Sequence, residues 1–493
     1  MIYVSFLFLV ACQTERQVST AVSETRPVTL EPTADTRPTS TPSPPPKEDS
    51  ITVEAVTATS DELPPFGLGD PIYPFLGNSG YDVLHYDLDL TVAVDANMIS
   101  GSVAIEGVAT EPLEKILFDL AGMRVHQVAI NDQLAQFERQ ETKLIITPEQ
   151  ALDEGEPFTA VIQYAGSPQI IPDSGAPMTL GWQPQTGGSF VVSEPTGAMN
   201  WFPNNNHPSD KATYNMRFTL PQPYGVVANG VLVDSQQTGY QNIYEWHMDQ
   251  PMASYLAIAQ VNEYEVAAGV TESGISIRNY FPIETPDEVR AAFDVTASMM
   301  SFMEKTIAPY PFDRYGVVLL SQPTNWALET QSIATYGSNG PSREERIIHE
   351  LSHQWFGNSV SIATWEDIWL NEAFATYFQH MWNDYTGHAS IEASMQDLYN
   401  SIAANKMPSP IPSKAADLFG PAVYWRGAYT LHALRETVGD DAFLDILRIY
   451  YLRYQGGNAS TADFIAVAEE VGGESAAATL IEWLYGDAVP ARE

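Results

Sequence analysis

Cysteine is nearly absent from this sequence. Its 493 residues include one cysteine, Cys12, so no disulfide bond can form within the chain. The cysteine content therefore gives no information about the redox compartment. With 44% hydrophobic residues, the chain is nevertheless long enough to bury the cores of two or three domains.

Basic residues are also scarce. The sequence has 23 Lys and Arg residues against 62 Asp and Glu residues, which gives a formal net charge of −39 at pH 7. A chain this acidic repels the phosphate backbone of nucleic acids, so we expect no nucleic-acid partner. The acidic residues are scattered, which is typical of a solvated surface. An acidic groove that attracts cationic substrates is compatible with the same composition.

The apolar run at the start of the chain, MIYVSFLFLVAC, is too short to span a bilayer. Its length suits the hydrophobic core of a signal peptide. The run ends in LVAC, which resembles the lipobox of bacterial lipoproteins, although no Lys or Arg precedes it. The resemblance implies a signal peptide over residues 1–12, an acylated Cys12 and an extracytoplasmic protein anchored to a membrane at the cell surface or in the periplasm. The alternative is an ordinary secretory signal in which the cysteine falls here by chance.

Residues 13–65 are rich in Thr, Pro and Ser, as in TRPTSTPSPPPKEDS. Such a segment has too few large apolar side chains to form a core, so we expect it to be disordered. Its prolines favour an extended chain of about 3 Å per residue. The simplest interpretation is a tether.

Strand patterns dominate residues 66–262. The stretch YDVLHYDLDLTVAV alternates apolar and polar residues with period two, as half-buried strands do, and FTAVIQYAG, ATYNMRFTLP and YGVVANGVLVD follow the same pattern. Helical periodicity takes over from the helix-start sequence Thr285-Pro286-Asp287-Glu288, within a second domain that we expect to comprise residues 263–493. The sequence thus predicts a multidomain α+β protein, with a β-rich domain followed by a mainly helical one.

The most informative stretch is RIIHELSHQWFGN, from Arg346 to Asn358. Ser342 and Glu345 have the spacing of a capping box, so we expect a helix to begin there and Gly357 to end it. Histidines four residues apart then share one helix face and can reach one metal ion. The glutamate between them is placed to contact a water molecule on the metal. A chance HExxH in an ordinary amphipathic helix is the alternative.

A catalytic zinc site needs a third protein ligand. The stretch TWEDIWLNEAFATYFQHMW supplies Glu372 at the start of the next amphipathic pattern. The interval after His353 is long enough for a turn and an antiparallel return. The sequence therefore predicts a site of two histidines and one glutamate.

Together these motifs resemble the M1 family of zinc aminopeptidases, which are gluzincins. HELSHQWFGN and WLNEAFATY carry the resemblance, and YDVLHYDLDLTV, NWFPNNNHPSDKATYNMRFTLP, YPFDRYGVVLL, WALETQ and AVYWRGAYTLHALR agree with it in order and spacing. It extends from about residue 80 to the end. It implies a saddle-like N-terminal β domain followed by a thermolysin-like peptidase domain that hydrolyses peptides with a free N-terminus.

The resemblance also implies roles for individual residues. His349, His353 and Glu372 match the ligands of one Zn²⁺ per chain. Glu350 matches the general base that activates water, and Tyr424 matches the tyrosine that stabilises the oxyanion. From the sequence alone, Tyr424 would otherwise be interpreted as a core aromatic residue.

The substrate-binding residues follow from the same resemblance. Glu329 and Glu194 match the two acids that bind the substrate's amino terminus. Ala327 lies in the segment that runs along the substrate, and Arg426 takes the place of a lysine in the family's tyrosine motif.

The chain departs from the family pattern at several positions. Trp326 replaces a glycine and Thr330 an asparagine, which affects the pocket for the N-terminal residue, and Val192 replaces a glutamine near Glu194. We also expect the helical C-terminal domain of larger members to be missing, which would leave the site more open. The alternatives are a non-catalytic scaffold or binding lipoprotein, an open-site endopeptidase, or an epoxide hydrolase.

Overall fold

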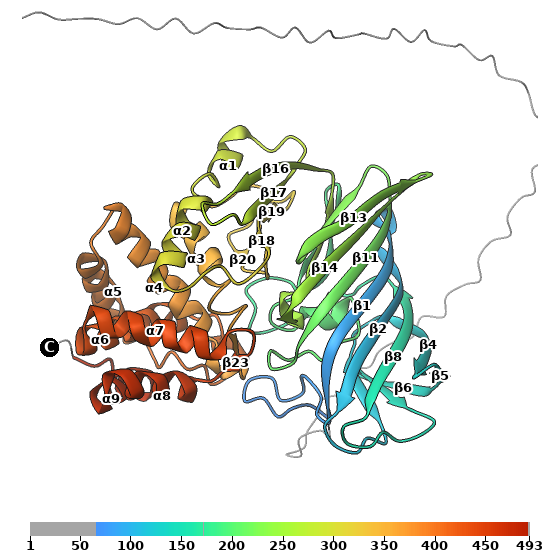
Figure 1. Cartoon of the computed structure of the whole chain (residues 1–493), viewed down its shortest axis with the longest axis horizontal. Coiled ribbons are helices and arrows are strands. Elements are labelled where there is room, and N and C mark those ends of the chain that lie inside the picture. The colour runs from blue at the N-terminus through green and yellow to red at the C-terminus, as the bar shows by residue number, and fades with distance from the viewer. Residues whose placement is uncertain (1–65, 171, 492–493) are drawn as a thin grey trace, which may run out of the picture. The chain divides into compact units, whose positions relative to one another are not determined.

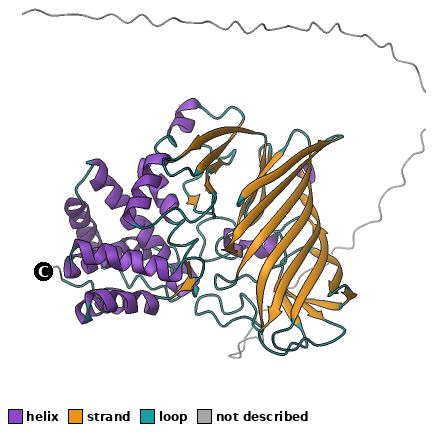
Figure 2. Cartoon of the chain, in the orientation of Figure 1, coloured by secondary structure: helices purple, strands orange, loops and turns teal. Residues whose placement is uncertain are grey.

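The computed structural model describes residues 66–170 and 172–491. The protein has a β-rich N-terminal part followed by a largely helical part, as the sequence predicts (Figures 1 and 2). In the view of Figure 1, the large sheet and the C-terminal helices lie on either side of a smaller sheet. Cys12 and the predicted tether lie outside the described residues. Within the described residues, no helix is long and apolar enough to cross a membrane.

An eight-stranded sheet forms most of the N-terminal part. Its strands, in spatial order, are β13 (Val231–Thr238), β14 (Gln241–Ala253), β11 (Lys211–Pro221), β1 (Tyr81–Ala93), β2 (Met98–Ala109), β8 (Pro157–Gly166), β4 (Arg124–Ile130) and β5 (Gln133–Leu134). The pair β1–β11 is parallel, and the other pairs are antiparallel. Along β1, Tyr86, Leu88, Leu90 and Val92 are buried, which confirms the predicted period of two, and the phase shifts only at a bulge between Val83 and His85.

Two smaller sheets complete this part of the molecule. One comprises β12 (Gly225–Ala228), β15 (Ala259–Asn262), β10 (Gly188–Val192) and β9 (Gly181–Gln185). The other comprises β3 (Ile116–Asp119), β7 (Lys143–Thr147) and β6 (Gln136–Gln140). Glu194 lies two residues after the end of β10, so the first of these sheets positions it.

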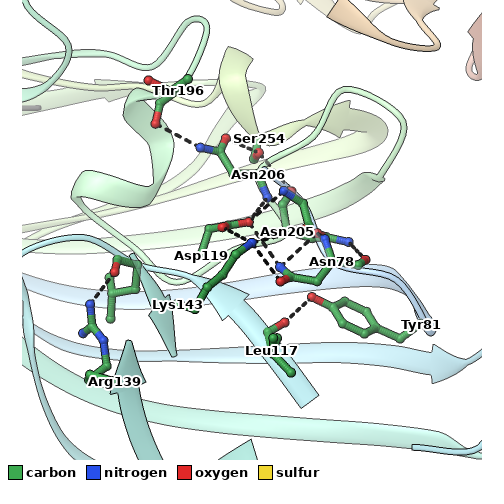
Figure 3. Close-up of polar contacts among 12 residues, drawn as sticks. Asn78, Tyr81, Leu117, Asp119, Arg139, Lys143, Thr196, Asn205, Asn206 and Ser254 are labelled. Atoms are coloured by element: carbon green, nitrogen blue, oxygen red, sulfur yellow. Dashed lines mark hydrogen bonds and ion pairs between the residues drawn. The ribbon is translucent and has the colours of Figure 1, made fainter. Parts of the chain in front are cut away.

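A buried polar cluster holds the segment that precedes β1 (Figure 3). Lys143 Nζ donates to Asp119 Oδ1 at 2.6 Å, to the Gly77 carbonyl at 2.8 Å and to Asn78 Oδ1 at 2.9 Å. Asp119 Oδ2 in turn accepts from the backbone N–H groups of Gly77 and Asn206. A buried ion pair is tolerated when its remaining donors and acceptors are satisfied, as they are here.

Two side chains connect the N-terminal and helical parts. Asp70 accepts from the backbone N–H groups of Ile72, Tyr73 and Trp365. From β11, Lys211 Nζ donates to the carbonyl groups of Asn358 (2.9 Å), Ser359 (3.0 Å) and Gly457 (3.3 Å). These bonds hold the β-rich part against the loop that follows the HELSH sequence.

The second part begins with another sheet and continues as helices. The sheet has the order β16 (Tyr264–Val270), β17 (Ser276–Pro282), β19 (Val317–Leu319), β21 (Ala334–Tyr336) and β20 (Ala327–Leu328), with β18 (Arg314–Tyr315) paired to β17. Short strands β22 (Ser361–Ile362) and β23 (Asn458–Ala459) pair with each other. The α-helices are α1 (Asp287–Ala291), α2 (Thr296–Thr306), α3 (Glu344–Ser352), α4 (Trp369–Thr386), α5 (Ile391–Asn405), α6 (Gly427–Val438), α7 (Asp440–Tyr454), α8 (Thr461–Gly472) and α9 (Glu474–Tyr485).

Both predicted helix starts are wrong in detail. Helix α1 follows Pro286, and the Thr285 hydroxyl donates backwards to the Pro282 carbonyl at 2.7 Å. Helix α3 follows Arg343, and no side chain of the described residues caps it, so Ser342 and Glu345 do not form the capping box. Glu345 instead accepts from Asn383 of α4 through its side chain. Packing against α4 therefore takes precedence over the local capping preference.

Candidate metal centre and active site

Helix α3 presents His349 and Glu350 to a cavity. Ile347, Ile348 and Leu351 are fully buried and fix the orientation of the helix. His353 follows the last helical residue but keeps a helical backbone, with φ −57° and ψ −23°. The two imidazoles therefore remain one turn apart on the same face, as the spacing predicts.

Glu372 joins the two histidines from the first turn of α4. Its Oε2 atom lies 3.3 Å from His349 Nε2 and 3.7 Å from His353 Nε2. One nitrogen or oxygen from each of the three residues lies within 4.8 Å of the others. The structure thus brings together the three side chains that the sequence predicts as metal ligands.

The donor chemistry of this trio fits a zinc ion. Burial lowers the pKa of His349 to about 4 and also lowers that of His353, so both imidazoles are neutral with a lone pair available. Burial raises the pKa of Glu372 to about 8, so a nearby cation is needed for its carboxylate to be ionised at neutral pH. Two neutral imidazoles and one carboxylate are a common zinc-binding set.

Contacts around His353 orient its ring. Its Nδ1 atom lies 3.2 Å from the Phe356 carbonyl, which leaves Nε2 directed at Glu372. Gly357 has φ +129°, and a Cβ atom there would lie 3.3 Å from His353 Nδ1. A residue with a side chain at this position would therefore be strained and would crowd the ring.

Glu350 lies beside the trio and is 5% exposed. Burial raises its pKa well above the usual value, and the negative charges of Glu329 and Glu372 add to the effect. A carboxyl group with a raised pKa next to a candidate metal centre suits the role of a proton acceptor for water.

Glu329 and Glu194 approach the same place from different parts of the chain. Glu329 follows β20, and its carbonyl accepts from Gln354 Nε2 at 2.9 Å and from Asn358 Nδ2 at 2.6 Å. Each of the two glutamates has a buried Oε1 atom without a hydrogen-bond partner among the described residues. Burial, together with the charges of Glu329, Glu372 and Glu350, raises the pKa of Glu194 well above its usual value. A cationic ligand would satisfy this pair of acids.

Tyr424 lies next to His349, within the π-helix η6 (Ala422–Arg426). A π-helical turn is uncommon and often occurs at a functional site. The ring stacks on His349 with a centroid distance of 6.2 Å and an interplanar angle of 19°. Burial raises the pKa of its hydroxyl group well above 10, so the phenol stays protonated and can donate a hydrogen bond.

All of these side chains line one cavity of about 320 Å³. Ala327 and Trp326 also line it, whereas Thr330 is buried behind the wall, where its hydroxyl donates to the Ile333 carbonyl. Several further residues that line the cavity are not predicted from the sequence, namely Pro177, Met178, Asn325, Leu328, Arg346, Thr376, Gln379, Phe419 and Trp425. They come from distant segments, and for most of them no local motif marks the contribution.

The expected substrate contact of Arg426 is not supported. Its side chain is fully buried and is not among the residues that line the cavity. The guanidinium donates to the carbonyl groups of Trp483 (3.0 Å), Met407 (3.0 Å), Gly486 (2.6 Å) and Ala488 (3.4 Å). Although Tyr424 lies two residues away, the Arg426 side chain points to the other side of η6. Its hydrogen bonds connect α9 and the residues that follow it to the backbone at Met407.

Known proteins are similar to this chain in both sequence and fold. Residues 83–256 match the model of the peptidase M1 N-terminal domain, and residues 291–483 match that of the peptidase family M1 domain. The crystal structure of an M1 zinc metallopeptidase from Deinococcus radiodurans superposes with a TM-score of 0.82 at 32% identity, covering 86% of this chain and 99% of that one. A mutant of the same enzyme was crystallised with a Tyr-Ser-Ala substrate.

Longer relatives match over part of their length. Human endoplasmic reticulum aminopeptidase 1 is 25% identical over 77% of this chain and 44% of its own length. Human glutamyl aminopeptidase is 24% identical over 87% of this chain and 48% of its own length. The chain thus spans less than half the length of these two curated relatives.

Proposed function

The chain belongs to the M1 family of peptidases, and from that premise we propose that it is a zinc-dependent aminopeptidase with one zinc ion per chain. It would remove the N-terminal residue from peptides. One observation carries the proposal: two buried acids with unpaired oxygens lie next to a His–His–Glu trio in a single cavity. The trio can bind a metal ion, and the two acids can bind a free amino group.

His349, His353 and Glu372 would hold the zinc ion. When bound there, zinc supplies a Lewis acid that polarises the peptide carbonyl and lowers the pKa of water. The Phe356 carbonyl keeps His353 Nε2 directed at this point. The positive charge would also favour ionised Glu372, whose carboxylate is otherwise disfavoured by burial.

Glu350 and Tyr424 would carry out the proton and charge chemistry. Glu350 takes a proton from the attacking water and then delivers it to the departing amine. The Tyr424 hydroxyl donates a hydrogen bond to the carbonyl oxygen as negative charge develops on it. Both groups are held in place before substrate arrives, which reduces the reorganisation needed in the transition state.

Glu329 and Glu194 would bind the substrate's ammonium group. Gln354 and Asn358, which follow the HELSH helix, hold the Glu329 backbone, so the amine site and the metal site share one support. Ala327 and Trp326 form the wall beside the N-terminal side chain. Because the ammonium site is fixed relative to the trio, cleavage would be confined to the first peptide bond.

We also propose that Cys12 is acylated and anchors the protein to a membrane outside the cytoplasm. The support is the sequence LVAC after a short apolar run, together with the Pro-, Thr- and Ser-rich segment that follows it. Two or more acyl chains would hold the protein stably on a membrane, whereas one would not.

The activity is tested by measuring metal content and hydrolysis together. The purified protein should contain one zinc per chain and should release amino acids from a panel of neutral aminoacyl reporter substrates. Chelation should abolish turnover, and added Zn²⁺ should restore it. A metal-free protein that hydrolyses the panel at the same rate would refute the proposed function.

A further inference from the structure

Arg346 is a cation in a cavity whose other charged walls are acidic. The described residues that line the cavity include four glutamates, two histidines and this arginine. Its Nη2 atom donates to the Asn325 carbonyl at 3.0 Å. No ion pair involves its guanidinium among the described residues. Because a guanidinium has five N–H donors, most of its hydrogen-bonding capacity is available to a ligand.

The two kinds of charge lie at opposite ends of α3. Gln354, just past the end of the helix, holds the backbone of Glu329. Arg346 lies in the first turn of the same helix. Ser352 lies six residues after Arg346, which corresponds to about 9 Å along the helix axis. The cavity is therefore acidic at one end and basic at the other, and the His–His–Glu trio lies between them.

A second cavity continues beyond Arg346. It has a volume of about 690 Å³ and shares Arg346, Gln379 and Trp425 with the first. Its remaining walls are mostly polar and carry charges of both signs, from the acids Glu345 and Asp397 and the cation Arg343. Arg346 thus lies at the junction, where a peptide passing from the first cavity to the second would meet it.

We propose that Arg346 binds a carboxylate carried by the residue that follows the scissile bond, which makes it a specificity-determining residue. The proposal rests on the proposed aminopeptidase function. With the ammonium group at Glu329 and Glu194 and the first carbonyl at the trio, the rest of the substrate extends toward Arg346. Two extended residues cover about 7 Å, so the second residue comes within reach of the guanidinium.

The chemistry favours a carboxylate over a neutral group. A guanidinium and a carboxylate form paired, charge-assisted hydrogen bonds of matching geometry. The carboxylate has two sources: the C-terminus of a dipeptide, or the side chain of Asp or Glu as the second residue. A purely structural role, in which Arg346 only holds the loop at Asn325, is the competing explanation.

The test uses four substrates with the same N-terminal residue: Leu-Ala, Leu-Ala-amide, Leu-Glu-amide and Leu-Gln-amide. Initial release of leucine gives kcat/KM for each. The substrates form two pairs: Leu-Ala carries a terminal carboxylate that Leu-Ala-amide lacks, and Leu-Glu-amide carries a side-chain carboxylate that Leu-Gln-amide lacks. In at least one pair, we expect the wild-type kcat/KM to be about tenfold or more higher for the member with the carboxylate. A preference within the first pair assigns the terminal carboxylate, and one within the second assigns the side chain.

Variants separate recognition from structure. In Arg346→Gln, the ratio of the two kcat/KM values within the preferred pair should fall close to one. Arg346→Lys should keep part of the preference. Arg124→Gln removes the same charge from an exposed residue of β4 that lines neither cavity, and it should keep the full preference. Comparing ratios between variants cancels the intrinsic reactivity of each substrate. A structural role would slow all four substrates equally and lower the melting temperature without changing the ratios.

The outcomes also distinguish this inference from the proposed function. Failure of wild-type protein to hydrolyse neutral aminoacyl reporters would refute the aminopeptidase itself. Normal hydrolysis of those reporters, with equal kcat/KM within both pairs or with a preference that survives Arg346→Gln, would overturn only the role of Arg346.

Discussion

Replacing Glu350 by glutamine should remove the proton acceptor while leaving the site intact. The position is buried, with 5% of the residue exposed, so a smaller side chain would leave a cavity. Glutamine avoids this because it has nearly the same shape as glutamate. Burial and the charges of Glu329 and Glu372 already disfavour the ionised carboxylate, so a neutral amide should not lower the stability of the fold. Loss of general-base catalysis should reduce kcat about 100- to 10,000-fold.

The assay measures zinc content, melting temperature and kcat on a neutral aminoacyl reporter. Glu344→Gln is a matched control, because it makes the same charge change on α3, and its amide oxygen can still accept from Trp382 Nε1. We expect the control to have normal kcat and Glu350→Gln to keep its zinc while losing turnover. Near-normal kcat in Glu350→Gln with full zinc occupancy would refute the assignment of the base.

Three further predictions follow. Tyr424→Phe should lower kcat about 100-fold with little change in KM, as expected for a lost oxyanion donor, and an unchanged kcat with a raised KM would make Tyr424 a binding residue. Arg426→Lys should lower the free energy of unfolding by about 2–4 kcal/mol, because hydrogen bonds to buried carbonyl groups are lost, and should leave KM unchanged. Urea titration and steady-state kinetics measure the two quantities, and a raised KM at full stability would show that Arg426 contacts the substrate after all. Cys12→Ser should move the protein from the membrane fraction to the soluble fraction of a lipoprotein-processing bacterium, and unmodified wild-type protein in the soluble fraction would contradict the anchor.

Local patterns predict those parts of the fold and site that depend on neighbouring residues. The period-two alternation from Tyr81 predicts β1, and its buried residues confirm the pattern. The four-residue spacing of His349 and His353 fixes their common face in any helix, so their proximity follows from backbone geometry. Glu372 could be predicted as a partner because it lies in the first turn of the next amphipathic helix, after an interval long enough for an antiparallel return.

Long-range packing decides the features that the sequence did not predict. Arg426 lies in a motif that suggests substrate contact, yet carbonyl groups from Met407 and the end of α9 surround its guanidinium. The capping box at Ser342 fails because Glu345 bonds to α4, a contact that no local pattern contains. Arg346 is next to a predicted motif, but only the folded structure shows that it lines the same cavity as Glu329 and Glu194.

The central claim is that this protein recognises a free amino terminus next to a zinc site. It is tested most directly by kcat/KM for matched peptides with free and N-acetylated termini, in wild-type protein and in Glu329→Gln. Acetylation removes the ammonium charge. For each ammonium–carboxylate pairing that is lost, the wild-type kcat/KM should be about tenfold to 100-fold lower for the acetylated peptide than for the free one. Glu329→Gln should narrow that difference. Equal cleavage of the two peptides by the wild-type protein would contradict the account and indicate an endopeptidase.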